Sequence, residues 1–219
     1  MAEDLRTMKS ADGIKEFDRG YELPDCVVLD SAYCSMGRMV ALRACKMAGW
    51  NYFDSPILLD LVPECGVTAE DVEDFERPFA DGVCDVAAVR ASEEFQRISG
   101  AFLLAVERAL AQGPCLIHDR ASRSLIESLG KHVVCAMTYA SDEEAMRVRA
   151  RFSPLYEHLT SDADLDAAIM RENNIRRAWH ALIGDGTRWG EPATYDLMLS
   201  TDLIGRDLAA ELLARLMRG

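Results

Sequence analysis

Short apolar runs that alternate with amphipathic stretches are the feature that most limits how this chain can fold. The apolar runs lie at residues 26–30, 51–54, 115–118, 132–139 and 195–199. Stretches with apolar residues at helical spacing separate them, among them 38–48, 94–112, 165–182 and 204–216. Strands that are apolar at nearly every residue are typical of a parallel sheet with helices on both faces. The sequence therefore predicts a three-layer α/β/α domain around a five-stranded parallel sheet.

The size and charge of the chain limit its partners. A chain of 219 residues with 49% hydrophobic residues can bury a core without disulfide or metal support. The formal charge of −13 argues against nucleic acid as a partner. No apolar run approaches the roughly 20 residues of a membrane span, so we expect no membrane contact. We expect a polar leader at 1–24 and one domain at 25–219.

The cysteines point to a reducing compartment. The chain has 7 of them, an odd number, and none stands in a CxxC pair. Such scattered cysteines are typical of reduced, buried, small apolar residues. Together with an N-terminus that lacks the apolar core of a signal peptide, they predict a cytoplasmic protein.

Several helix ends are marked in the sequence. Gly49 is expected to end the helix that begins at Arg38. Ser55 is expected to be an N-cap ahead of Pro56. Thr68 is expected to open a helix with a capping box that Asp71 completes.

The loop after the first strand is the first candidate site, because ligands of parallel α/β sheets bind beyond the carboxyl ends of the strands. It runs from residue 30 to 38, contains Gly37, and is followed by Arg38. A loop that cradles phosphate needs glycines, a cation and a helix N-terminus. Against the pattern GxxxxGK[ST], the segment 32–39 keeps one glycine, has arginine for lysine, and has Met39 in place of the magnesium-binding hydroxyl. An ordinary strand-to-helix turn is the alternative interpretation.

Three segments resemble the cytidylate kinase-like branch of the P-loop nucleoside monophosphate kinases. The first is 33–38, Tyr-Cys-Ser-Met-Gly-Arg, with 51–54 as its second strand. The second is 113–117 running into Arg120, and the third and most specific is 189–197, Trp-Gly-Glu-Pro-Ala-Thr-Tyr-Asp-Leu. The resemblance implies a P-loop NTPase fold with a small helical lid at about 142–187.

The resemblance also implies a set of site residues. The loop residues Ser35, Met36, Gly37 and Arg38 would bind donor phosphates, and Asp54 and Arg120 would bind the acceptor. The residues Arg147, Arg151 and Arg177 would close over the transferring group, with Arg149 nearby. Asp119 would place magnesium, although it could also cap the helix that follows.

Two departures from the family pattern bear on phosphate binding. Cys34 and Met36 stand where the family usually carries glycines, so side chains occupy a loop that must fold tightly around an anion.

Other candidates are weaker: His118 is expected to be a core histidine, and Trp179 a core aromatic residue.

The implied activity is transfer of a phosphoryl group from ATP, with Mg²⁺, to a nucleoside monophosphate, and CMP is the acceptor that the resemblance favours. Such catalysis would rest on positioning and charge neutralisation. The alternative is a degenerate relative that binds a nucleotide or a protein partner without turnover. Whether the chain forms a homodimer stays open.

Overall fold

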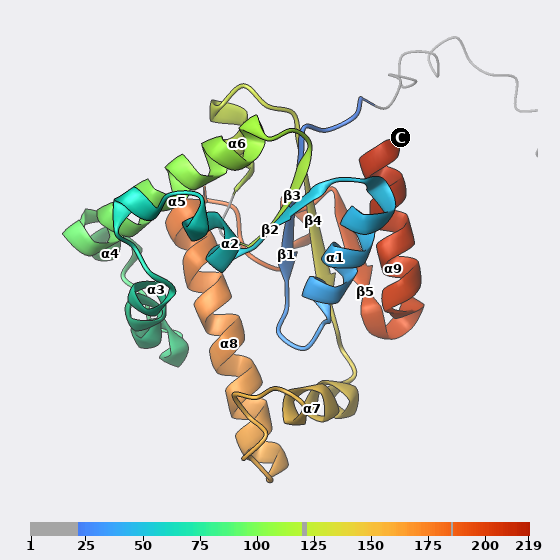
Figure 1. Ribbon diagram of the computed structural model, residues 1–219. Coiled ribbons are helices and arrows are strands. Elements are labelled where there is room, and N and C mark those ends of the chain that lie inside the picture. The colour runs from blue at the N-terminus through green and yellow to red at the C-terminus, as the bar shows by residue number, and fades with distance from the viewer. Residues whose placement is uncertain (1–21, 120–121, 185) are drawn as a thin grey trace, which may run out of the picture.

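The computed structural model describes residues 22–119, 122–184 and 186–219, and its centre is a parallel sheet (Figure 1). The strands are β1 (Cys26–Ser31), β2 (Asn51–Phe53), β3 (Cys115–His118), β4 (Val133–Tyr139) and β5 (Leu197–Ser200). All neighbouring strands pair in parallel, in the order β2-β3-β1-β4-β5. The predicted five-stranded parallel sheet is confirmed.

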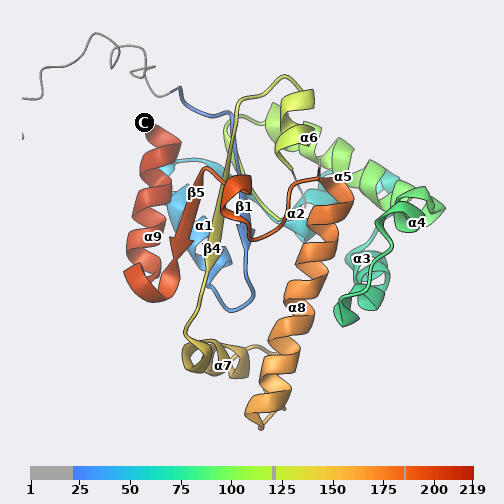
Figure 2. The same cartoon turned by 180° about the vertical axis from the view of Figure 1, so that it is seen from behind.

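Helices cover both faces of the sheet, as expected for strands that are buried on both sides (Figures 1 and 2). One face carries α1 (Gly37–Ala48) and α9 (Thr201–Arg218). The other carries α2 (Ser55–Asp60), α5 (Glu93–Ala111), α6 (Arg123–Ser128) and the upper part of α8 (Asp162–Ile183). Outside these layers lie α3 (Ala69–Glu76), α4 (Val86–Ala91) and α7 (Glu143–Arg151). Short 3-10 turns occupy Pro63–Cys65, Arg77–Asp81 and Pro192–Thr194.

Alternation along β1 divides the core into two halves. Val27 and Leu29 pack towards α1 and α9, whereas Cys26 and Val28 pack towards α5 and α8. Both halves contain side chains with no measurable exposure, such as Leu29 in the first and Leu58 in the second. Each fully buried aliphatic side chain stabilises the fold by about 1.5–3 kcal/mol. Trp179 belongs to the second half at 2% exposure, beside Phe75, Phe95 and Phe102, so its expected place in the core is confirmed.

The predicted helix ends are mostly confirmed. Gly49 ends α1 in the left-handed conformation, and Thr68 and Asp71 form the capping box of α3. The N-cap of α2 is Asp54 rather than Ser55, because the Asp54 carboxylate accepts the hydrogen bond from the Ile57 amide at 3.3 Å. A carboxylate at the helix N-terminus also interacts favourably with the helix dipole.

The segment expected as a lid contains α7 and α8. In Figure 1, α7 and the lower end of α8 lie below the carboxyl edge of the sheet. The upper part of α8 packs in the core through Trp179 and Leu182. This helix therefore joins the segment expected as a lid to the core. Within the described residues, no helix is both long enough and apolar enough to cross a membrane.

The turn from β1 into α1 depends on the absence of a side chain at Gly37. A Cβ atom there would lie 2.3 Å from the Ser31 Cβ and 2.7 Å from the Thr138 Oγ1. Both distances are far below van der Waals contact, so only glycine lets α1 begin this close to β1 and β4.

We predict that Gly37→Ala lowers the free energy of unfolding by about 1–3 kcal/mol, because the added methyl group overpacks this contact. Gly100→Ala is the matched control: a Cβ there meets no atom within 4 Å, and the residue lies inside α5. It should raise stability by about 0.5–1 kcal/mol. Urea unfolding of both variants tests the pair, and equal effects would contradict the role given to Gly37.

Candidate functional site: the loop between β1 and α1

The loop between β1 and α1 keeps a glycine-like backbone at positions that carry side chains. Cys34 has a φ of 66° and Met36 a φ of 61°, both in the left-handed region. The Ser35 amide donates to the Ala32 carbonyl at 3.1 Å and tightens the turn. The structure therefore folds the loop tightly although two of its expected glycines are absent.

A third such residue lies at the same edge of the sheet. Among the described residues, only Cys34, Met36 and Asp119 combine a side chain with positive φ, and Asp119 has a φ of 57°. Its Oδ1 accepts a hydrogen bond from the Ser31 amide at 3.3 Å, which joins the end of β3 to the end of β1. Residues held in such conformations cost about 1–3 kcal/mol each and cluster at functional sites.

The N-terminus of α1 has no cap of its own. Its N-cap residue is Met36, whose side chain accepts no hydrogen bond, and its first turn has no acidic residue. Each of the other α-helices in the described part of the chain has a capping side chain or an acidic residue in its first turn. The amides of Gly37 and Arg38 have no carbonyl four residues back within the helix, so they can bind an anion.

Behind the loop, hydroxyl groups bind one another rather than face the solvent. The buried Ser35 hydroxyl lies 2.9 Å from that of Thr138. The Ser31 hydroxyl lies 2.8 Å from His118 Nε2. The Ser35 hydroxyl is therefore already engaged by Thr138, and its amide by the Ala32 carbonyl.

Arg38 and Asp54 lie together, although the resemblance assigns Arg38 to the donor phosphates and Asp54 to the acceptor. Their Nη2 and Oδ2 atoms are 3.2 Å apart, and the Arg38 side chain is 67% exposed. Tyr52 donates to the same Asp54 oxygen at 3.2 Å and lies 3.2 Å from His118 Nδ1. The expected core histidine is 9% exposed and hydrogen-bonded on both ring nitrogens, and it also lines the pocket described next.

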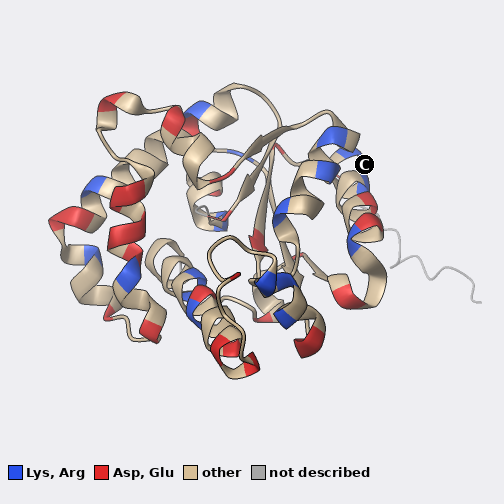
Figure 3. Ribbon diagram, turned by 60° about the horizontal axis from the view of Figure 1, so that its bottom comes forward, with Lys and Arg blue, Asp and Glu red and all other residues tan. Residues whose placement is uncertain are grey.

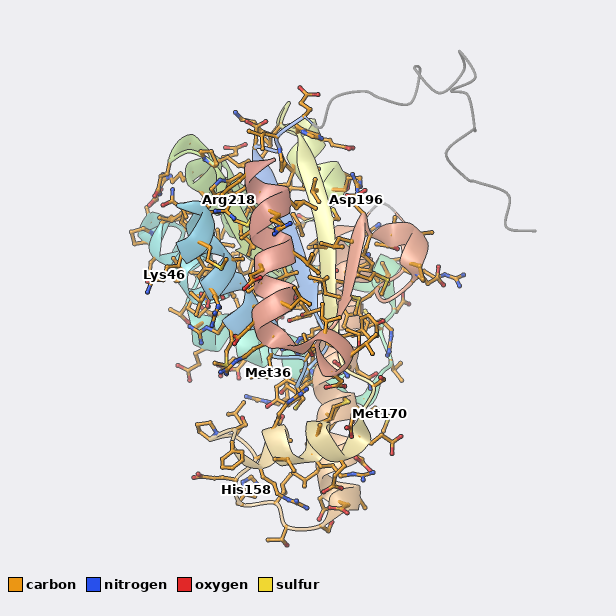
Figure 4. All side chains as sticks on the ribbon, turned by 90° about the vertical axis from the view of Figure 1, so that its right-hand side faces the viewer. Met36, Lys46, His158, Met170, Asp196 and Arg218 are labelled. Carbon is orange, nitrogen blue, oxygen red and sulfur yellow. The ribbon has the colours of Figure 1, made fainter. Side chains whose placement is uncertain are left out.

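A pocket of about 430 Å³ lies between the loop and the lid helices. The loop residues Cys34, Met36 and Arg38 line one side, and Arg149, Phe152 and Arg176 line the other. Figure 4 shows Met36 at this level, above the lid segment that carries His158 and Met170. The pocket therefore faces cations from two elements, α1 and the lid.

Arg149 and Arg176 are the lid arginines that reach the loop. Arg149 donates to the Cys34 carbonyl at 2.9 Å and pairs with Asp202 at 2.9 Å. Arg176 lies over the Tyr33 ring, 5.3 Å from the ring centre, and donates to Glu172 Oε2 at 3.1 Å. Burial alone lowers the pKa of Arg176, but Asp119 and Glu172 outweigh it and raise the pKa, so the guanidinium stays charged.

The three arginines that the resemblance selected lie elsewhere. Arg147 makes a two-pronged pair with Asp166 at 2.8 and 2.9 Å, and Arg151 pairs with Asp162 at 2.6 Å. Both brace α7 against α8. Arg177 donates to Asn174 at 2.8 Å and lies over the Trp189 ring. None of the three lines the pocket, and Figure 3 shows basic and acidic residues interspersed on these helices.

Asp119 lies beside His118 and the Arg176 guanidinium. Its Oδ2 is 3.8 Å from His118 Nε2 and 4.0 Å from Arg176 Nε. It does not cap α6, because the N-cap of that helix is Ser122. The expected acceptor-binding residue Arg120 lies outside the described residues.

The oxygen ligands at this site fit a Mg²⁺ ion only if the ion keeps most of its bound water molecules. Asp119 can offer a carboxylate, but position 39 carries methionine and the Ser35 hydroxyl is bonded to Thr138. Mg²⁺ commonly keeps several waters and takes one or two carboxylates together with substrate phosphates. These residues therefore fit an ion carried by a nucleotide rather than one held by the protein alone.

The Cys34 thiol is unreactive at neutral pH. Burial raises the pKa of its thiol to about 11, so the thiol is protonated at neutral pH. Its role in the loop is therefore conformational, since the thiolate is the reactive form.

Comparison with known proteins supports the fold. No family model matches the chain, and a search of curated proteins finds no match. Among solved structures, an uncharacterized protein from Eubacterium ventriosum aligns with a TM-score of 0.60 at 10% identity, over 88% of this chain and 98% of that one. Shikimate kinase from Bacteroides thetaiotaomicron aligns with a TM-score of 0.53 at 7% identity, over 89% and 99%. The chain has the fold of a P-loop kinase.

We predict that glycine and alanine have opposite rankings at positions 36 and 39. At position 36 the left-handed φ penalises any side chain by about 1–2 kcal/mol, so Met36→Gly should be more stable than Met36→Ala. Met39 lies in the right-handed part of α1, where glycine costs about 1 kcal/mol relative to alanine. Urea unfolding of the four variants measures the sign of the stability difference between glycine and alanine at each position. The same ranking at both positions would contradict the left-handed loop.

Proposed function

We propose that this protein is an ATP-dependent phosphotransferase that uses the loop between β1 and α1 as its phosphate site. The observation that carries the proposal is the left-handed backbone at Cys34 and Met36, which directs the loop onto the uncapped N-terminus of α1. An anion at that point would supply the missing cap and interact favourably with the helix dipole.

The cations of the pocket suit a transferring phosphoryl group. The Arg38 side chain is 67% exposed, although its partner Asp54 is buried. A phosphate can therefore take over Arg38 while Tyr52 still donates to the Asp54 carboxylate. Arg176 is already fixed by Glu172 and Tyr33, and such a preorganised cation stabilises developing charge without reorganisation. A magnesium ion bound with the nucleotide would neutralise phosphate charge, and Asp119 is the residue proposed to orient its waters.

For the acceptor we propose a nucleoside monophosphate, with CMP as the first candidate. The resemblance of segments 33–38 and 189–197 to cytidylate kinase-like proteins supports this choice. Asp54 and Arg120 are the proposed acceptor contacts. In Asp54, Oδ1 caps α2 while Oδ2 faces Arg38 and Tyr52, so one oxygen is available for exchange with a ligand.

A second candidate is nucleotide binding without turnover. The side chains of Cys34 and Met36, and the engagement of the Ser35 hydroxyl by Thr138, favour it. Both candidates require phosphate binding at the loop, and they differ only in turnover.

We predict acceptor-dependent release of ADP from ATP and magnesium, which Arg38→Ala abolishes. A charge-assisted hydrogen bond contributes about 1.5–3 kcal/mol, so nucleotide affinity should fall about 10- to 100-fold. Arg43→Ala is the control, because Arg43 lies on the same helix and pairs with Asp207. Thermal shift with ATP, ADP and each nucleoside monophosphate, followed by an ADP assay, gives the measurement. Nucleotide binding without ADP release, whichever acceptor is added, would establish the second candidate. Absence of nucleotide binding would refute both candidates.

We further predict that substitutions of the arginines of α7 and α8 have different effects, depending on whether the side chain lines the pocket. Arg149→Ala and Arg176→Ala should weaken ATP binding by at least about 10-fold, because both side chains line the pocket. The resemblance gives Arg147, Arg151 and Arg177 a role in closure, which would require α7 and α8 to give up their present pairs. Arg147→Ala should therefore change kcat more than ATP affinity. Isothermal titration and steady-state kinetics distinguish the two, and equal losses of affinity would contradict the geometry.

A further inference from the structure

A second, smaller cavity lies behind the loop pocket, at the carboxyl ends of β1 and β3. Asp30, Asp119, Arg176 and Trp189 line it, with parts of α8. Arg176 lines this inner cavity and the loop pocket alike, so the two share one guanidinium. The inner cavity is far smaller than the loop pocket and is matched to a single small group.

Two of the residues that line this cavity, Arg176 and Trp189, each carry a buried donor without an acceptor among the described residues. The Nε of Arg176 and the Nε1 of Trp189 are buried and have no hydrogen-bond partner within the described part of the chain. A buried donor without a partner costs about 1–3 kcal/mol. Two such donors around one cavity indicate a ligand atom that accepts from both.

Carboxylates complete the lining. The Asp30 Oδ2 accepts from Tyr195 at 2.7 Å and lies 3.1 Å from His180 Nδ1, so this carboxylate is fixed in place. The Asp119 Oδ2 lies 4.0 Å from Arg176 Nε. That distance is too long for a hydrogen bond and short enough for one oxygen atom to bridge.

The donor and acceptor pattern restricts the chemistry of the occupant. An anion would accept from Arg176 and Trp189 but would meet two carboxylates, and a cation would leave both donors unpaired. A hydroxyl oxygen accepts two hydrogen bonds and donates one, which suits the two donors and one carboxylate. Water can also donate to the second carboxylate.

We propose that the inner cavity is a binding site for one hydroxyl oxygen, supplied by water or by a hydroxyl group of the acceptor. Trp189 is then a positioning residue: through the shared oxygen it holds the Nε side of Arg176, whose other side lies at the loop pocket. Only the acceptor source rests on the proposed function, because a bound water needs no activity.

A double-mutant cycle tests whether one group joins the two donors. Trp189→Phe removes the indole N–H, and Arg176→Lys removes Nε–H while it keeps the charge. With a shared oxygen, Trp189→Phe lowers the melting temperature by more than the control Trp50→Phe, and the double variant loses less than the sum of the two single variants. Additive losses, or a Trp189→Phe variant at least as stable as the wild type, would overturn the proposal.

A crystal structure of the full chain identifies the oxygen. We expect a peak within about 3.2 Å of both donor nitrogens, absent from the Trp189→Phe crystal or displaced in it. Direct bonding of either nitrogen to a protein oxygen would refute the site. In crystals grown with CMP, a separate peak identifies water and a peak continuous with the ligand identifies an acceptor hydroxyl. If CMP does not bind, the acceptor assignment fails while the water peak still decides the site.

Discussion

The contact of Gly37 with Ser31 and Thr138 is the constraint on which the candidate site depends. Because no side chain separates them, α1 begins directly against the ends of β1 and β4. That approach brings the first amides of the helix, and Arg38 with them, to the carboxyl edge of the sheet. The hydroxyl pair of Ser35 and Thr138 fastens the loop from behind. A bulkier residue at position 37 would separate the helix from the edge where every other component of the site converges.

The backbone strain around this contact is compensated by packing. Cys34, Met36 and Asp119 together store several kcal/mol, at about 1–3 kcal/mol each. Such conformations persist only where the surroundings allow no alternative. Here the Tyr33 amide donates to Asn173 of α8 at 2.7 Å, and Arg149 holds the Cys34 carbonyl at 2.9 Å. The loop is thus held from the sheet and from the lid at once, which accounts for a tight turn without the usual glycines.

Much of the scaffold could be predicted from the sequence, because buried strands and amphipathic helices have their own periodicities. The strand that ends at His118 and the capping box at Thr68 follow from local chemistry. The arginines could not be assigned in the same way. Adjacent helical residues point about 100° apart, so the pattern groups Arg147 with Arg151 but does not say which face meets the loop. Residues 149 and 176 face it only because of how α7 and α8 pack.

Two of the cations at the loop, Arg38 and Arg176, differ in how they are held, and this difference suits them to different tasks. Arg38 is exposed and bound to one carboxylate, so it can follow a ligand that enters or leaves. Arg176 is held by Glu172, by the ring of Tyr33 and by the charge of Asp119. A fixed cation in a site of low dielectric constant stabilises the charge that develops in a transition state, because the cation does not have to reorganise during the reaction. In the proposed phosphotransfer, Arg38 would therefore suit capture of the nucleotide, and Arg176 would suit the transfer step itself.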